Sequence, residues 1–184
     1  MNTGPIAHRY AKALLKYVQE NRTGEEVYSQ AGLLVLRMQG LRQLADAVQK
    51  HPELSLEMKL TILDSALGAP MADPLRKFTA LVYKQGRIEI FDRMLYSFIE
   101  QYRAATGIKV GRLVTAVPVP GLKDRLQSIL GEQTGASVIL EETVSPDILG
   151  GFILNVDDLR MDASVEGQLR QLRRRLIDNN NRIV

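Results

Sequence analysis

Apolar side chains recur at helical spacing through the N-terminal part of the chain, and turn signals interrupt them at short intervals. Pro5 suits the first turn of a helix, and Thr23 with Glu26 has the spacing of a capping box that opens a second one. Gly40 is a weak point that divides off a short third helix. The pattern therefore predicts a series of short helices joined by tight connections.

The same kind of signal marks three further helices. His51 precedes a proline and ends the third helix, because the residue before proline disfavours the helical basin. Ser55 is placed to cap a fourth helix, and Asp73 with Pro74 is placed to cap and begin a fifth. The fourth helix is expected to end at Gly68 with Pro70, and the fifth at Gly86. A sixth is expected from about Ile88 to Thr106. Six helices with short connections predict an antiparallel bundle over residues 1–106.

The pattern changes after Gly107. β-Branched residues alternate with polar ones, which predicts strands, and two stretches return to helical spacing. Ser164 is placed to cap the last helix. The expected elements are strands at 109–119, 137–144, 151–156 and about 160–161, with helices at 122–132 and from 165 onward. We therefore predict a mostly α, α+β chain: an N-terminal six-helix antiparallel bundle, then a small C-terminal α/β part (107–184) with a short sheet and a terminal amphipathic helix.

The first helix has more apolar circumference than one core can cover. Its apolar arc is about 200° wide, whereas a helix over a single core needs a stripe only somewhat wider than 100°. One side of this arc holds Ala7, Ala11, Leu14, Leu15 and Val18, and the other holds Ile6, Tyr10, Ala13 and Tyr17. Two interpretations stay open at this point: a central helix surrounded by its own bundle, or a helix that offers one side to a partner's helix.

Composition argues against catalysis. The 24 Lys and Arg nearly balance the 21 Asp and Glu, there is no cysteine, and only His8 and His51 are available as imidazoles. Disulfides, thiol chemistry and Cys-ligated metals are excluded, and the sequence contains no glycine-rich phosphate loop. The Gly150-Gly151 pair leads into a strand, so it predicts a bulge or a close backbone approach instead. We expect no enzyme, no metal and no cofactor.

The last helix carries one basic cluster, formed by Arg170, Arg173, Arg174, Arg175 and Arg182. A nucleic-acid site typically combines such a cluster with aromatic side chains on which bases stack, but the sequence contains no Phe or Tyr after Phe152. A solvated face or a contact for an acidic protein is favoured. An RNA-binding module stays open as the alternative, and an enzyme with an unrecognised site is a second rival.

The chain lacks the apolar run of about 20 residues that a membrane-spanning helix needs. Its N-terminus also lacks a basic region followed by a long apolar stretch, so it is not typical of a signal peptide. We therefore expect a chain that stays on the cytoplasmic side.

Several short segments, in order along the whole chain, resemble one known family. The sequence is similar to the delta subunit of the F-type ATP synthase, the bacterial counterpart of the mitochondrial oligomycin sensitivity-conferring protein. Each motif is weak alone, and their ordered combination is specific. They are Arg9-Tyr10-Ala11-Lys12-Ala13-Leu14, His51-Pro52 with Lys59 and Leu63, Gly86-Arg87-Ile88, Ser145-Pro146-Asp147-Ile148-Leu149-Gly150-Gly151-Phe152, and Met161-Asp162-Ala163-Ser164-Val165-Glu166-Gly167-Gln168-Leu169.

The resemblance implies a non-catalytic stator subunit. Members of this family link the catalytic alpha/beta head to the peripheral stalk of b subunits, so that the head does not rotate with the rotor during proton-driven ATP synthesis. They bind no nucleotide and are peripheral membrane proteins through the complex alone, here on the cytoplasmic face of a bacterial inner membrane.

The resemblance also implies two partner sites. In the family, the first and fifth helices of the bundle form a groove for the N-terminal helix of an alpha subunit, which places that groove on Tyr10, Ala13, Leu14, Tyr17, Phe78 and Val82. The C-terminal part is expected to hold the C-terminal coiled coil of the b subunits, which we place on Gly150, Gly151, Phe152, Leu169, Leu172 and Leu176.

Overall fold

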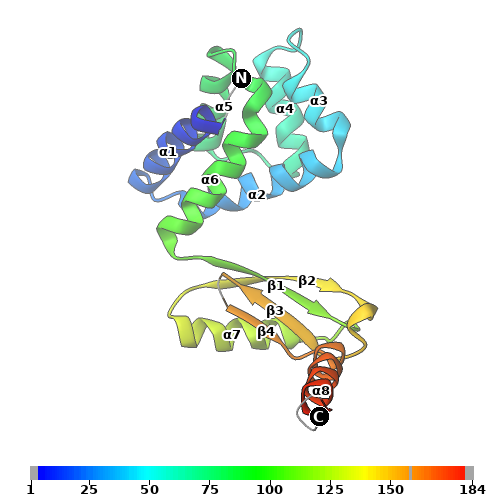
Figure 1. The fold of residues 1–184 in the computed structure, drawn as a ribbon. Helices are drawn as coiled ribbons and strands as arrows, with labels where there is room; N and C mark the ends of the chain where they lie inside the picture. The colour runs from blue at the N-terminus through cyan, green and yellow to red at the C-terminus, as the bar shows by residue number, and fades with distance from the viewer. Residues whose placement is uncertain (1–3, 158, 181–184) are drawn as a thin grey trace. The chain divides into compact units, whose positions relative to one another are not determined.

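A computed structural model describes residues 4–157 and 159–180, with side chains in the last helix as far as Arg174. The chain divides into two compact units, residues 1–105 and 106–184. It is mostly helical and contains one small four-stranded sheet, as the mostly α, α+β prediction required (Figure 1).

The first unit is built from helices around one apolar core. Its elements are α1 (Gly4–Glu20), α2 (Gly24–Gly40), α3 (Arg42–Gln49), α4 (Leu56–Leu67), α5 (Asp73–Lys84), a 3₁₀ turn η1 (Ile88–Ile90) and α6 (Phe91–Thr106). Side chains from all six α-helices enter the core, where Leu34, Leu63, Leu75, Phe91 and Phe98 are fully buried. Most of the unit's stability comes from this shared burial, because helices this short are marginal alone.

Most of the expected helix boundaries are confirmed. The Ser55 hydroxyl accepts a 3.3 Å hydrogen bond from the Met58 amide at the start of α4, and Gly68 ends that helix in the left-handed region. Helix α2 ends at Gly40, as predicted. The local signals were therefore sufficient wherever a side chain or a glycine alone sets the end of a helix.

Two expected caps are wrong. The backbone of Thr23 has ψ near 17° and not the extended value of a cap, and its buried hydroxyl makes no hydrogen bond within the described part of the chain. Asp73 is the first residue of α5, while Ala72 holds the capping position. The carboxylate of Asp73 still lies in the first turn, where the helix dipole favours negative charge.

The second unit contains the sheet. Its elements are β1 (Lys109–Thr115), α7 (Leu122–Thr134), β2 (Val138–Val144), a 3₁₀ turn η2 (Pro146–Ile148), β3 (Phe152–Val156), β4 (Leu159–Asp162) and α8 (Val165–Asn180). The strand order is β2-β1-β3-β4; β1 and β2 are parallel, and the other pairs are antiparallel. Strand β1 ends at Thr115, before the predicted Val119, and the segment that follows contains Pro118 and Pro120, which have no amide for a sheet ladder.

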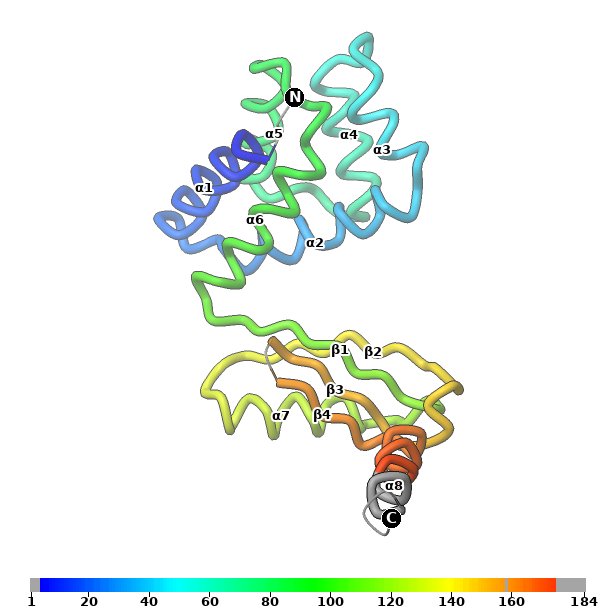
Figure 2. Tube along the Cα trace, in the orientation of Figure 1, coloured from blue at the N-terminus to red at the C-terminus, as the bar shows by residue number. Residues whose placement is uncertain are grey.

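Helix α7 covers one face of this sheet (Figure 2). Leu113, Leu140 and Leu154 point from three strands into a small core that Leu130 of α7 closes. Because side chains alternate along a strand, the neighbouring positions of β1, β2 and β3 belong to the opposite face. There the register pairs Arg112 with polar residues of β2 and β3.

The Gly-Gly pair makes a close backbone approach, as predicted. Gly151 has φ +75°, and a Cβ there would collide with the Ala163 carbonyl oxygen. The Ser164 hydroxyl accepts a 3.0 Å hydrogen bond from the Gly167 amide, which confirms the predicted cap of α8. The glycine turn and the start of the last helix are thus packed together.

Candidate functional site

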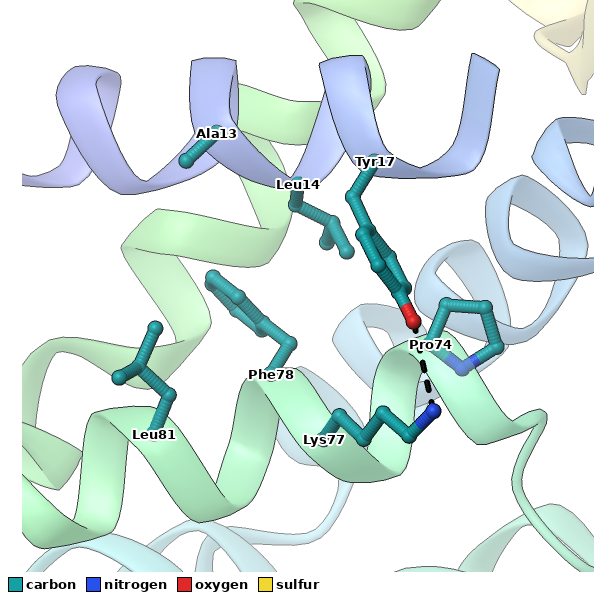
Figure 3. A pocket seen from close by; sticks show the side chains of 7 residues that line it. All are labelled: Ala13, Leu14, Tyr17, Pro74, Lys77, Phe78 and Leu81. Atoms are coloured by element: carbon teal, nitrogen blue, oxygen red, sulfur yellow. Dashed lines mark hydrogen bonds between the residues drawn. The ribbon is translucent and has the colours of Figure 1, made fainter. Parts of the chain in front are cut away.

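Two hollows lie side by side between α1 and α5. The first has a volume of about 290 Å³ and is lined by Ala13, Leu14, Tyr17, Pro74, Lys77, Phe78 and Leu81 (Figure 3). The second, of about 330 Å³, is lined by Arg9, Tyr10, Ala13, Phe78, Leu81, Gln85 and Arg87. Ala13, Phe78 and Leu81 line both, so the hollows form one continuous depression, which we call the α1–α5 furrow.

Helix α1 buries one of its two apolar sides and covers the other only in part, since Ile6 and Tyr10 are half-buried against the core. Ala7, Ala11 and Val18 are buried in the core, as is Leu14, which also lines the furrow. On the other side Ala13 is exposed and Tyr17 is 37% exposed. The interpretation of α1 as a central helix surrounded by its own bundle is therefore wrong, because the bundle leaves this side open.

Helix α5 supplies the floor and one rim. Phe78 is almost fully buried and forms the floor, and its ring packs near that of Phe91 in the core. Val82, expected in the groove, is fully buried and lines neither hollow, so its place in the site is wrong. It lies one residue beyond the position that faces outward, which is Leu81.

Leu81 lines the furrow but was not among the groove residues predicted from the sequence, and the same holds for Pro74, Gln85 and the basic residues Arg9, Lys77 and Arg87. Leu81 is 47% exposed and lines both hollows. Its spacing of three residues from Phe78 puts both side chains on one helix face, so the signal was present. What the pattern lacked was the direction of the core, which decides whether Leu81 or Val82 points inward.

A cation–tyrosine pair stands at each end of the furrow. Lys77 Nζ donates a 3.3 Å hydrogen bond to the Tyr17 hydroxyl and lies 6.0 Å from the ring centre. Arg87 donates a 3.3 Å hydrogen bond to the Tyr10 hydroxyl, with its guanidinium carbon 5.5 Å from that ring centre. Each phenol therefore keeps its ring against the furrow and its polar tip on a cation.

In the second unit, α8 carries an exposed apolar stripe. Val165, Leu169 and Leu172 follow one another at i, i+4 and i+7, and Leu169 and Leu172 are each more than half exposed. Leu176, expected to continue this stripe, lies outside the residues whose side chains are described. The apolar stripe is a surface that the unit itself does not cover.

The Gly150–Phe152 segment has a structural explanation of its own. The Gly150 carbonyl accepts a 3.0 Å hydrogen bond from the Val165 amide, so this turn fixes the start of α8. Phe152 is only partly exposed and packs against the core of the sheet. Leu169 and Leu172 are therefore the described residues, among those expected to contact the stalk, whose apolar surface is exposed.

The arginines of α8 make an exposed basic face. Arg170 pairs with Glu166 one turn earlier, and Arg173 and Arg174 are exposed. The side chain of Arg175 and the whole of Arg182 lie outside the described residues. The described arginines have no aromatic side chains among them on which bases could stack.

The described part of the chain offers no site for metal chemistry. Among the side chains that the structure describes, no group of three or more His, Asp or Glu is arranged to hold a metal ion. None of the described helices is both long enough and apolar enough to cross a membrane. What these surfaces can do is bind other polypeptides through apolar contacts with charged edges.

Comparison with known proteins gives a consistent result over nearly the whole chain. The family model described as ATP synthase delta (OSCP) subunit matches residues 6–176. An ATP synthase subunit delta from Phocaeicola vulgatus is 34% identical, and one from Bacteroides fragilis is 32% identical, each over the full length of both chains. A chain of the cryo-EM structure of the Toxoplasma gondii mitochondrial ATP synthase hexamer has the same fold, with TM-score 0.64 and 20% identity, covering 93% of this chain and 97% of that one.

Proposed function

Because this chain belongs to the ATP synthase delta (OSCP) subunit family, we propose that each of its two units holds a different part of the enzyme's stator. The family match confirms the resemblance found in the sequence motifs. The chain is a non-catalytic subunit of the F-type ATP synthase, with its role in the peripheral stalk. The match gives no support to RNA binding by the arginines of α8.

The first unit, as a six-helix antiparallel bundle, binds the N-terminal helix of an alpha subunit in the α1–α5 furrow. The observation that supports this proposal is the uncovered apolar side of α1 facing Phe78 and Leu81 of α5. A groove between two helices is a common receptor for an amphipathic helix, whose apolar residues enter it at i, i+3, i+4 and i+7. The furrow is open along both of its hollows, as such a ligand requires.

The size of the furrow is sufficient for firm binding. Burying one apolar side chain contributes about 1.5–3 kcal/mol. Four or five such anchors give roughly 6–15 kcal/mol, against an association cost of about 4 kcal/mol or more. The upper part of this balance, roughly 8–11 kcal/mol, corresponds to dissociation constants from about 1 μM to about 10 nM. Slow dissociation then lets the contact withstand the torque of the rotor without any chemistry in this subunit.

The second unit binds the C-terminal coiled coil of the b subunits through the apolar stripe of α8. Val165, Leu169 and Leu172 have the spacing of a seam that packs against another helix. The glycine turn at Gly150–Gly151 fixes the direction in which α8 leaves the sheet. Through these partners the chain is held at the cytoplasmic face of the bacterial inner membrane.

Calorimetry with a peptide taken from the N-terminus of the alpha subunit, here called the alpha peptide, tests the first contact. Ala13→Asp puts a carboxylate on the apolar wall of the furrow, so binding should fall below detection while the exposed position leaves the fold intact. Ala104→Asp, at an exposed position of α6, is the matched control and should bind like the unmodified chain. Equal affinity of the two variants, both folded by circular dichroism, would contradict the assigned face.

A further inference from the structure

The charged residues around the α1–α5 furrow share one sign. Among the described residues that line its two hollows, the charged ones are Arg9, Lys77 and Arg87, and all are basic. The floor, formed by Phe78, is apolar, and so are Ala13 and Leu81 on the walls beside it. An occupant must therefore match an apolar floor and a positive edge at the same time.

The positive edge has two fixed points. Lys77 is held by the Tyr17 hydroxyl and Arg87 by the Tyr10 hydroxyl. Tyr10 and Tyr17 are separated by about two turns of α1, a rise of about 10.5 Å along the axis. A helix lying along the furrow has the same rise per residue, so side chains seven positions apart on it match the spacing of Tyr10 and Tyr17, the residues that hold the two cations.

Both cations keep donors for a ligand. The Lys77 ammonium has three N–H donors and uses one for Tyr17, and the Arg87 guanidinium has five and uses one for Tyr10. The tyrosine ring beside each cation limits its motion before the ligand arrives, which lowers the entropy lost on binding. A carboxylate is the group that completes such a site, because its oxygens accept from ammonium and guanidinium donors.

We infer that the α1–α5 furrow selects an amphipathic helix that carries carboxylates at two positions seven residues apart, one for Lys77 and one for Arg87. The inference rests on the proposed function, since it specifies the charge pattern that the helix in the furrow must have. The apolar floor supplies most of the affinity. The two cations set the register and orientation of the helix and disfavour neutral and basic helices, as charges at the rim of an interface do.

A series of three synthetic helical peptides tests this inference with the full-length chain. All three have the same apolar stripe, and they carry Glu, Gln or Lys at the two positions seven residues apart. At low ionic strength the Glu peptide should bind about tenfold more tightly than the Gln peptide, and the Lys peptide should bind most weakly. The differences should shrink at about 1 M salt, where the Debye length is roughly 3 Å.

Charge reversal on the protein gives the complementary test. Lys77→Glu combined with Arg87→Glu should reverse the order, so that the Lys peptide binds best. Arg42→Glu combined with Arg125→Glu changes the net charge equally at exposed positions outside the furrow, and should keep the original order.

Each outcome of these measurements decides a different point. Equal affinity of the three peptides for the unmodified chain at low salt would overturn the charge inference and leave the furrow as a purely apolar site. Failure of all three peptides, together with the alpha peptide, to bind would overturn the proposed function itself. A reversed order for the furrow variant alone supports the inference.

Discussion

The ammonium of Lys59 in α4 donates a 2.6 Å hydrogen bond to the main-chain carbonyl of Val48, near the end of α3. It donates two more, of 3.2 Å to the Ala47 carbonyl and 2.8 Å to the His51 carbonyl. The side chain is fully buried, and this burial lowers the pKa of its ammonium. Lys59 thus supplies hydrogen-bond donors to main-chain carbonyls at the C-terminal end of α3, where the last carbonyls of a helix have no partner within the helix.

Lys59→Met should destabilise the first unit by about 3 kcal/mol, because it leaves buried carbonyl oxygens without donors. Lys50→Met is the matched control. Lys50 lies nearby but is exposed and only pairs with Asp46 one turn away, so its loss should change little. Denaturant unfolding followed by circular dichroism at about 222 nm, the helical band, measures both. Equal stability of the two variants would show that the buried ammonium contributes nothing.

Gly151→Ala should destabilise the second unit by about 3 kcal/mol or more, since the new methyl group meets the Ala163 carbonyl and the backbone has positive φ. Gly135→Ala separates the two causes. Gly135 also has positive φ, but nothing lies within 4 Å of its Cβ position, so only about 1–2 kcal/mol is expected. Hydrogen exchange of the β3 amides reports the result, and similar losses for both variants would rule out the close approach as the cause.

Leu81→Ala and Val82→Ala should have opposite effects. Val82 is fully buried, so its truncation should cost about 2 kcal/mol of stability with little change in peptide affinity. Leu81 is half exposed, so its truncation should leave stability within about 0.5 kcal/mol but weaken binding of the alpha peptide roughly tenfold. Thermal unfolding measures the stability of each variant, and calorimetry on the same samples measures its affinity for the alpha peptide. Loss of affinity in Val82→Ala alone would show that Val82, and not Leu81, contributes to the furrow.

The stability of the second unit should fall at acidic pH through Asp162. The Ser164 hydroxyl donates a 2.6 Å hydrogen bond to its carboxylate and the Ser164 amide a 3.1 Å one, which together lower the pKa of Asp162. Because the folded pKa lies below the unfolded one, the stabilisation is complete above the unfolded value of about 4 and is lost as pH falls through the folded pKa.

An NMR titration of the Asp162 carboxyl carbon measures this pKa directly. Asp162→Asn should make the stability of β3 and α8, followed by hydrogen exchange, less dependent on pH below about 4. An Asp162 pKa at or above its ordinary value would contradict the assigned cause.

Leu169→Gln combined with Leu172→Gln should abolish binding of a peptide from the C-terminal end of the stalk's b chain without unfolding the second unit. Both leucines are more than half exposed, so their removal takes little from the folded chain. Gln171→Ala, exposed on the same helix, is the control and should bind normally. Unchanged binding by the double variant would place the stalk contact elsewhere on this unit.

Local chemistry made several elements predictable. Ser55 and Ser164 cap helices because a hydroxyl next to free amides accepts their hydrogen bonds wherever the helix lies. Thr23 has the same chemistry but does not cap, and the residue after it, Gly24, packs against Tyr102 of α6, a contact that the local sequence does not reveal. A Cβ at Gly24 would lie 2.7 Å from that ring.

The amino-acid sequence alone establishes that α1 has two apolar sides, because the residue types and the 100° step of a helix suffice to place them. It also determined the family, through motifs that occur in order along the chain. The packing of the helices was needed to show which side of α1 stays open and that Leu81, not Val82, borders the furrow. The rotation of a helix about its axis is set by the neighbours it packs against, and those neighbours, including the cations that hold Tyr10 and Tyr17, come from distant parts of the chain.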